Sequence, residues 1–177
     1  MVQKLDTLSE TASQTAGPYV HIGLMPTYAG NGDSFKTEVG TDPIKGNVQG
    51  EIIEITGSIY DSTGWALRDV LIESWQCDAN GFFPGQEGAD PNFTGFCRFA
   101  ADAETGEFTL RTVKPGSYVG LSGVRSAPHI TLWIVSRGIN IGLHTRIYFS
   151  DCDNSQDPLL SRIEQTPRVD TLIANKA

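Results

Sequence analysis

Apolar residues recur at every second position in several short runs of the chain. Within residues 51–60, Ile53, Ile55 and Ile59 alternate with polar residues, which is the pattern of a half-buried strand. Similar runs predict further strands at residues 67–76, 108–113, 129–136 and 145–150, while residues 82–98, rich in Gly and Pro, predict a loop. Turn sequences separate the runs, and no helical period lies between them. The pattern predicts an all-β fold, an antiparallel β-sandwich, with short helical turns only after Asp153.

The first 50 residues depart from this pattern. Residues 1–16 are polar and predict an arm, a Gly17-Pro18 bend leads into alternating apolar residues, and residues 26–50 predict a long loop. A loop of this length in a compact domain is often functional or covered by a partner. We therefore expect residues 1–50 to form an arm and loop that pack on the domain or on a partner, and residues 51–177 to form the sandwich.

Composition and charge narrow the class of protein. The 177 residues, 39% of them hydrophobic, suffice for one domain with a sizeable core. A formal net charge of −8 without a Lys/Arg cluster argues against nucleic acid as a partner. Cys77, Cys97 and Cys152 are isolated and odd in number, which is typical of reduced cytoplasmic thiols rather than of disulfides or a zinc site. No run reaches the roughly 18 apolar residues of a membrane helix, and the first residues lack a signal-peptide core. We expect a cytoplasmic protein.

Few residues indicate chemistry by their spacing alone. Tyr118 and His129 lie where predicted strands meet loops, and such a pair could help to hold a ferric ion. The neighbouring Thr131 is not a ligand type, and no local metal signature occurs. Arg137 follows a predicted strand and precedes Gly138. An arginine in this setting can be held firmly enough to grip a carboxylate.

Several longer motifs carry a resemblance to a known family. They occupy residues 11–24, 69–76, 78–81, 112–116, 127–130, 137–141 and 143–149. In their order and spacing they resemble the α chains of the protocatechuate 3,4-dioxygenases, a group of intradiol ring-cleaving dioxygenases in the β-ketoadipate pathway of aromatic catabolism. The resemblance implies a β-sandwich, an enzyme of α and β chains, and cleavage of protocatechuate with O₂ to 3-carboxy-cis,cis-muconate. It also implies a non-haem Fe(III) held by two Tyr and two His of the β chain.

Carried over residue by residue, the resemblance implies that this chain has lost the iron site. Tyr118 follows Lys-Pro-Gly-x as in the β-type pattern, and His129 matches the first His of His-x-His. Thr131 replaces the second His, and residues 83–89 contain no Tyr in the place of the other phenolate. We therefore expect no metal and no catalytic residue on this chain, with Tyr118 and His129 as a partial relic of the ligand set.

The same resemblance assigns substrate contacts to this chain. The family's N-terminal segment, which reaches over the β-chain iron pocket, corresponds here to Thr15, Gly17, Pro18 and Tyr19. The family's arginine near the substrate carboxylate corresponds to Arg137. The expected role is an α subunit in a higher-order αβ oligomer, acting on a small aromatic substrate and O₂ at its partner's iron.

Two alternatives remain open. A self-sufficient homomeric intradiol dioxygenase would need Tyr28 or Tyr60 to replace the missing phenolate. A non-enzymatic binding module of transthyretin-like shape would need no iron. The family pattern also continues past the segment 171–174 with a β-rich tail, whereas this sequence stops at Ala177, so the chain is either a fragment or one for which the tail is dispensable.

Overall fold

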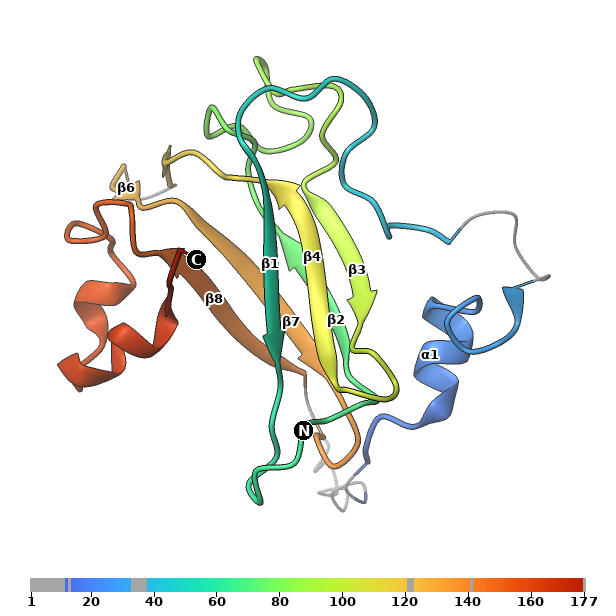
Figure 1. Ribbon diagram of the computed structural model, residues 1–177. Coiled ribbons are helices and arrows are strands. Elements are labelled where there is room, and N and C mark those ends of the chain that lie inside the picture. Colours follow the sequence, from blue (N-terminus) through green and yellow to red (C-terminus); the bar gives the residue numbers. More distant parts are fainter. Residues whose placement is uncertain (1–11, 13, 33–37, 121–122, 141, 177) are drawn as a thin grey trace, which may run out of the picture.

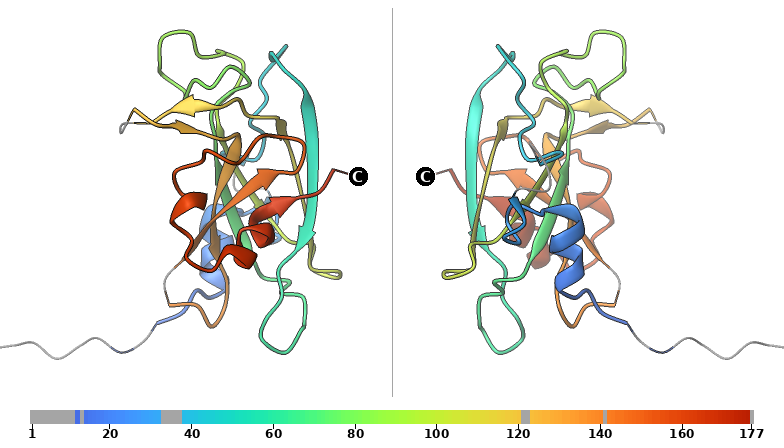
Figure 2. Two further views of the ribbon diagram at one scale, coloured as in Figure 1. Left: turned by 90° about the vertical axis from the view of Figure 1, so that its left-hand side faces the viewer. Right: turned by 90° about the vertical axis from the view of Figure 1, so that its right-hand side faces the viewer.

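Two layers of strands form the body of the protein (Figures 1 and 2). The computed structural model describes residue 12 and residues 14–32, 38–120, 123–140 and 142–176. One layer is a five-stranded sheet in the order β3-β2-β7-β8-β9, and the facing layer is the pair β1-β4. The bounds are β1 Ile52–Ser58, β2 Leu71–Trp75, β3 Phe96–Ala100, β4 Glu107–Val113, β7 His129–Val135, β8 Leu143–Phe149 and β9 Ile173–Ala174. A hairpin of β5 (Tyr118–Val119) and β6 (Arg125–Ser126) lies at one end of the sandwich.

The predicted sandwich and its strands are confirmed, with two differences. Neighbouring strands are antiparallel except β8 and β9, which pair in parallel. The prediction of a loop over residues 82–98 is wrong at its end, because β3 begins at Phe96 and pairs with β2. Alternation in β3 buries Cys97 and Phe99, but the Gly and Pro residues before it hide this short period.

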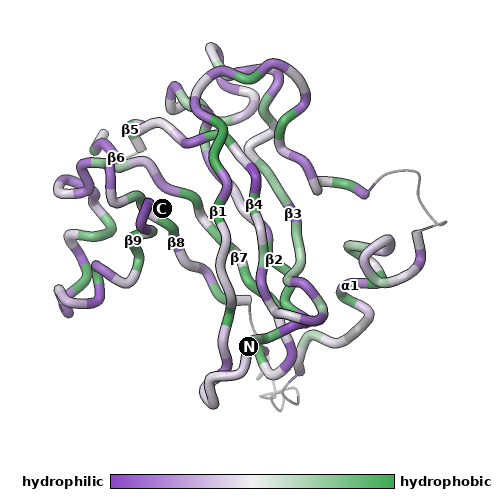
Figure 3. The backbone as a smooth tube through the Cα atoms, viewed as in Figure 1, coloured by the Kyte–Doolittle hydropathy of each residue, from purple (hydrophilic) through white to green (hydrophobic). Residues whose placement is uncertain are grey.

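The core lies between the two layers. The larger sheet contributes Ile72, Phe99, Ile130 and Leu132, and the smaller layer contributes Leu110. Figure 3 shows apolar stretches along the strands and polar residues concentrated in the connecting loops. Full burial of one such side chain stabilises the fold by about 1.5–3 kcal/mol, so this interface holds the layers together.

The predicted helical turns near the C-terminus are confirmed as 3₁₀ turns. They are η2 (Leu160–Arg162), η3 (Thr166–Arg168) and η4 (Asp170–Leu172). Leu160 packs against Ala127 and Tyr148 in a second apolar cluster. Since Tyr148 and Phe149 are neighbours in β8 and point to opposite faces, the turns cover the outer face of the large sheet while Phe149 joins the main core.

The N-terminal segment contains one helix, α1 (Pro18–Leu24). The alternating apolar residues after the Gly17-Pro18 bend therefore lie on a helix, which the sequence pattern did not predict. Proline presets a helical φ and lacks an N–H that the first turn would leave unpaired anyway, so Pro18 begins the helix. None of the described helices is long and apolar enough to span a membrane.

Candidate functional site

Tyr118 and His129 lie together where the β5–β6 hairpin meets the start of β7. Their ring centroids are 5.6 Å apart. His129 is 5% exposed, and its Nδ1 lies 2.8 Å from the carbonyl oxygen of Ala127. A carbonyl can only accept, so Nδ1 carries the proton and Nε2 is the acceptor nitrogen of the ring.

A tight turn brings the segment after β2 against Tyr118. The buried carboxylate of Asp78 accepts hydrogen bonds from the backbone N–H of Asn80 at 2.9 Å and of Phe82 at 3.0 Å. Gly81 has a φ of 87°, and a Cβ there would lie 2.2 Å from the carbonyl oxygen of Ser117. Only glycine combines this φ with such a close approach, so the turn fixes where Phe82 and the next residue lie.

Aromatic rings fill the space around this pair. Phe83 meets Tyr118 edge-on at 4.9 Å and stacks with Trp75 at 5.9 Å. On the other side, Tyr148 lies 5.3 Å from His129. The result is a continuous row from Trp75 through Phe83, Tyr118 and His129 to Tyr148, with one stacked contact, one edge-on contact and two tilted contacts.

Burial keeps the imidazole of His129 neutral, as a metal ligand must be, but it also keeps the Tyr148 hydroxyl protonated. Burial lowers the pKa of His129, and the nearby Arg146 lowers it further. Burial also raises the pKa of Tyr148 to about 12, and the Tyr148 hydroxyl donates to Asp157 at 3.0 Å. A ferric ion needs anionic phenolates and neutral imidazoles.

The residues present do not fit a ferric site. Phe83, which packs against Tyr118, has no ligand atom, and Thr131 lies opposite Arg146 in the register of β7 and β8. The row is flanked by an open pocket of about 520 Å³ whose lining includes Phe82, Phe83 and Arg125. Among the described residues, no three His, Cys, Asp or Glu side chains gather as a metal cluster.

Arg137 and Thr15 meet at the other end of β7. The Thr15 hydroxyl accepts a hydrogen bond from the backbone N–H of Gly138 at 2.6 Å. The Arg137 guanidinium pairs through Nε with Asp69 Oδ2 at 2.5 Å, and its side chain is 75% exposed. The structure thus brings the predicted arm residue and the predicted arginine to one place.

The two groups are far apart. β7 runs from His129 to Val135, so at about 3.3 Å per residue Arg137 lies roughly 25 Å from His129. Arg137 is therefore out of reach of any ligand held at Tyr118 and His129 of the same chain.

Gly17, Pro18 and Tyr19 lie at the start of α1, in the same N-terminal segment as Thr15. Gly17 is the N-cap with an extended φ of −130°, and Val20 N–H donates to its carbonyl oxygen at 3.0 Å. A Cβ on Gly17 would meet no atom within 4 Å among the described residues. Tyr19 is 82% exposed, so its ring faces away from the body of its own chain.

Neither tyrosine considered as a replacement ligand reaches His129. The Tyr28 hydroxyl donates to the carbonyl oxygens of Ala101 at 2.8 Å and Arg68 at 3.2 Å, beyond the start of β2. Tyr60 follows β1, whose end lies opposite the start of β4. Both lie at the Arg137 end of the sandwich.

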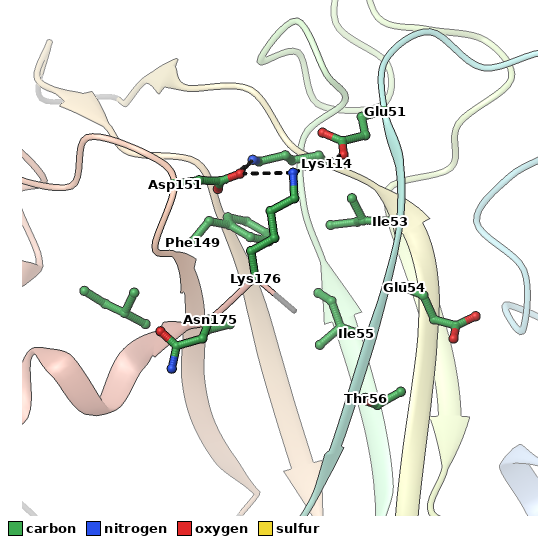
Figure 4. A pocket seen from close by; sticks show the side chains of 12 residues that line it. Glu51, Ile53, Glu54, Ile55, Thr56, Lys114, Phe149, Asp151, Asn175 and Lys176 are labelled. Carbon is green, nitrogen blue, oxygen red and sulfur yellow. Dashed lines mark hydrogen bonds and ion pairs between the residues drawn. The ribbon is translucent and has the colours of Figure 1, made fainter.

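A groove of about 570 Å³ runs between β1 and the β8–β9 edge (Figure 4). None of the residues that line it belongs to either group. Lys114 pairs with Asp151 across it at 2.7 Å, and Lys176 lies 3.8 Å from Glu51. The backbone carbonyl oxygen of Glu51 also accepts a hydrogen bond from the backbone N–H of Lys114. Alternate residues bond to the partner in an antiparallel pair, so Glu54 turns its backbone N–H and C=O toward the groove.

Sequence reasoning missed two residues that shape these ends. Asp69 pairs with Arg137, and Asp157 anchors Tyr148. Asp69 lies in one of the family motifs, but its sequence position alone does not mark it as functional. An acidic residue before a strand usually just contacts solvent. The signal for Asp157 was the following Pro158, since Asp before Pro often opens a turn.

Nearly the whole chain is similar to known dioxygenases. A family model described as Dioxygenase matches residues 24–176. The protocatechuate 3,4-dioxygenase alpha chain of Pseudomonas putida is 45% identical over 174 residues, which cover 97% of this chain and 86% of that relative. A protocatechuate 3,4-dioxygenase beta chain of Burkholderia cepacia is 41% identical over 78 residues, which cover 41% of this chain and 33% of that relative.

Solved structures agree with these matches. The 3-chlorocatechol 1,2-dioxygenase of Rhodococcus opacus 1CP superposes with a TM-score of 0.56 at 26% identity. The match covers 64% of this chain and 50% of that one, so the chain spans half the length of this neighbour. The chain therefore belongs to the dioxygenase family, and to the intradiol branch that contains the protocatechuate 3,4-dioxygenase alpha chains.

Proposed function

We propose that this chain is the α subunit of a protocatechuate 3,4-dioxygenase. It completes the active site of an iron-bearing β subunit, and the assembled enzyme cleaves protocatechuate with O₂ to 3-carboxy-cis,cis-muconate. The Fe(III) that supports this oxidation is held by the β subunit. The chain contributes substrate contacts and neither metal ligands nor a catalytic residue.

One observation carries the proposal: Arg137 and Thr15 come together at one end of β7, whereas Tyr118 and His129 lie at the other end. An exposed guanidinium this far from Tyr118 and His129 is available to a substrate bound by a neighbouring chain. Its fixed fork of N–H donors matches a carboxylate. Arg137 then binds the carboxylate of protocatechuate and leaves the two ring hydroxyls for the partner's iron.

The N-terminal segment is proposed to close the partner's pocket. A Cβ added to Gly17 would meet no described atom within 4 Å, so packing within this chain does not require glycine there. A close approach of the Gly17 backbone to an aromatic ligand would require glycine. The exposed ring of Tyr19 would be buried by the partner and exclude water from the substrate.

The cytoplasm is the proposed location. All three cysteines are free, and Cys77 and Cys97 are buried, as expected where thiols stay reduced. Assembly with the β chain into a higher-order αβ oligomer is the proposed working state.

Kinetics of the reconstituted αβ enzyme test the proposal. Arg137→Ala should raise the KM for protocatechuate, because loss of one charge-assisted contact costs roughly 1.5–3 kcal/mol, or about 10- to 150-fold. Arg125→Ala is the matched control, since it removes an exposed arginine near the former metal site and should leave KM unchanged. Unaltered kinetics in Arg137→Ala would remove the carboxylate role.

Iron analysis of the purified chain separates the remaining alternatives. The proposal expects no stoichiometric Fe(III) and no tyrosinate charge-transfer colour without the β chain. Colour together with catechol cleavage by the chain alone would favour a homomeric enzyme. Failure to assemble with any iron-bearing homologue would favour a binding module.

A further inference from the structure

The strand register places an acid opposite Arg137. β2 and β7 are antiparallel, with Leu71 opposite Val135. Two residues further out on each strand, Asp69 faces Arg137, and Asp69 Oδ2 lies 2.5 Å from Arg137 Nε. The pair is asymmetric: the Asp69 side chain is 30% exposed and the Arg137 side chain 75%. The acid is thus the fixed member and the arginine the one that reaches into solvent.

The surroundings of Asp69 and Arg137 are anchored on both sides. The hydroxyl of Ser136 donates to Asp69 Oδ1 at 3.4 Å, and Ser136 is 1% exposed. On the far side of Arg137, the backbone of Gly138 is held by the Thr15 hydroxyl at 2.6 Å. Arg137 therefore projects from a turn that is fixed before it by a buried serine and after it by the N-terminal arm.

The contact with Asp69 uses only one corner of the guanidinium. Arginine carries five N–H donors, one on Nε and four on the two Nη atoms. Among the described side chains, only Asp69 forms an ion pair with Arg137. The Nη atoms are not part of this ion pair, and together they have the geometry of a fork for a second carboxylate.

We propose that Asp69 is a positioning residue for Arg137: it holds Nε so that the Nη fork points to the carboxylate of a substrate bound in the partner subunit. This inference rests on the proposed function. A long exposed arginine without such a contact samples many rotamers, and ordering it on binding weakens affinity. Asp69 removes part of that cost before the substrate arrives.

Asp69→Asn in the reconstituted αβ enzyme tests the inference, because it removes the charge and keeps the shape. The KM for protocatechuate should rise about two- to tenfold, the cost of ordering one long side chain, with kcat unchanged. The inhibition constant of catechol, which has no carboxylate, should not change. The double variant Asp69→Asn/Arg137→Ala should be no worse than Arg137→Ala alone, and Asp69→Glu should restore part of the loss.

The outcomes distinguish the positioning role of Asp69 from the proposed carboxylate contact of Arg137. If Arg137→Ala raises KM and Asp69→Asn does not, Asp69 has no positioning role. A lower KM in Asp69→Asn would mean that Asp69 competes with substrate for the guanidinium, which overturns the inference. Equal losses with protocatechuate and catechol would show a structural role only. If Arg137→Ala itself has no effect on KM, the proposed function of this site fails first.

Discussion

Asp157 should be one of the most costly polar residues to replace in this chain. It is 1% exposed, and its carboxylate accepts four hydrogen bonds. Oδ2 receives the N–H of Ala127 at 2.9 Å, and Oδ1 receives the Tyr148 hydroxyl at 3.0 Å and the N–H groups of Leu159 and Leu160 at 2.9 and 3.2 Å. These bonds tie the start of β7, the outer face of β8 and the first C-terminal turn together.

The magnitude follows from the geometry. A hydrogen bond to a charged group contributes about 1.5–3 kcal/mol, but bonds to one carboxylate are not additive. Asp157→Ala leaves the buried N–H and hydroxyl donors without an acceptor. It should cost about 3–5 kcal/mol, as when one partner of a buried charged network is removed. Asp157→Asn keeps an oxygen for the three donors on Oδ1 but turns an amide N–H toward Ala127, so it should cost about 2–3 kcal/mol.

Urea unfolding of the chain, followed by tryptophan fluorescence, measures these losses. Tyr148→Phe removes one of the four bonds and should cost about 1 kcal/mol, and Asp153→Asn, in an exposed turn of the same segment, should cost far less than Asp157→Asn. If Asp157→Asn unfolds at the same urea concentration as the parent chain, the carboxylate does not hold these segments together.

The same residue predicts a pH dependence. Burial would raise the pKa of Asp157, but the N–H groups of Leu159, Leu160 and Ala127 and the Tyr148 hydroxyl lower it below its ordinary value of 3.8. A lowered folded-state pKa stabilises the fold above pH 3.8, and this stabilisation is lost as the pH falls through the folded-state pKa. Acid should therefore narrow the difference between the parent chain and Asp157→Asn, and a constant difference down to pH 2 would contradict the assignment.

Two further predictions concern a glycine and the thiols. Gly81→Ala should cost several kcal/mol, because the new Cβ would lie 2.2 Å from the Ser117 carbonyl oxygen. Gly64 has a similar φ of 86° but no atom within 4 Å of the new Cβ, so Gly64→Ala should cost about 1 kcal/mol. Thermal unfolding compares the two variants, and equal losses of stability would mean that only the φ matters. Burial raises the pKa of Cys77 and of Cys97 to about 11, so at pH 8 a thiol reagent should label the partly exposed Cys152 first; rapid labelling of all three in the native protein would contradict this burial.

The sequence predicted the strands well where burial is one-sided. β1 and β7 have clear alternation, and their buried and exposed positions follow it. β3 was missed because five residues after a glycine-rich stretch are too few for a visible period. The helix α1 was missed because Pro18 and the residues after it fit a bend as well as a helix start, and only contacts with the rest of the chain decide between them.

The sequence names the residues of the candidate site but not their arrangement. That neither position 131 nor residues 83–89 offer a Tyr or a His is visible in the sequence. The aromatic row from Trp75 to Tyr148 is not, because its members come from different strands and loops. The pairing of Arg137 with Asp69 depends on the register of β2 and β7, which no single-strand pattern can give.

The groove beside β1 has a consequence for copies of the chain that meet before they assemble. An open strand edge can template pairing with another copy and so start aggregation. The charges on residues 51–58 are those of Glu51 and Glu54, so two β1 edges that approach each other bring together negative charge from both copies. Like charges across a strand pair are destabilising. The glutamates that line the groove thus work against polymerisation of the subunit through its own edge.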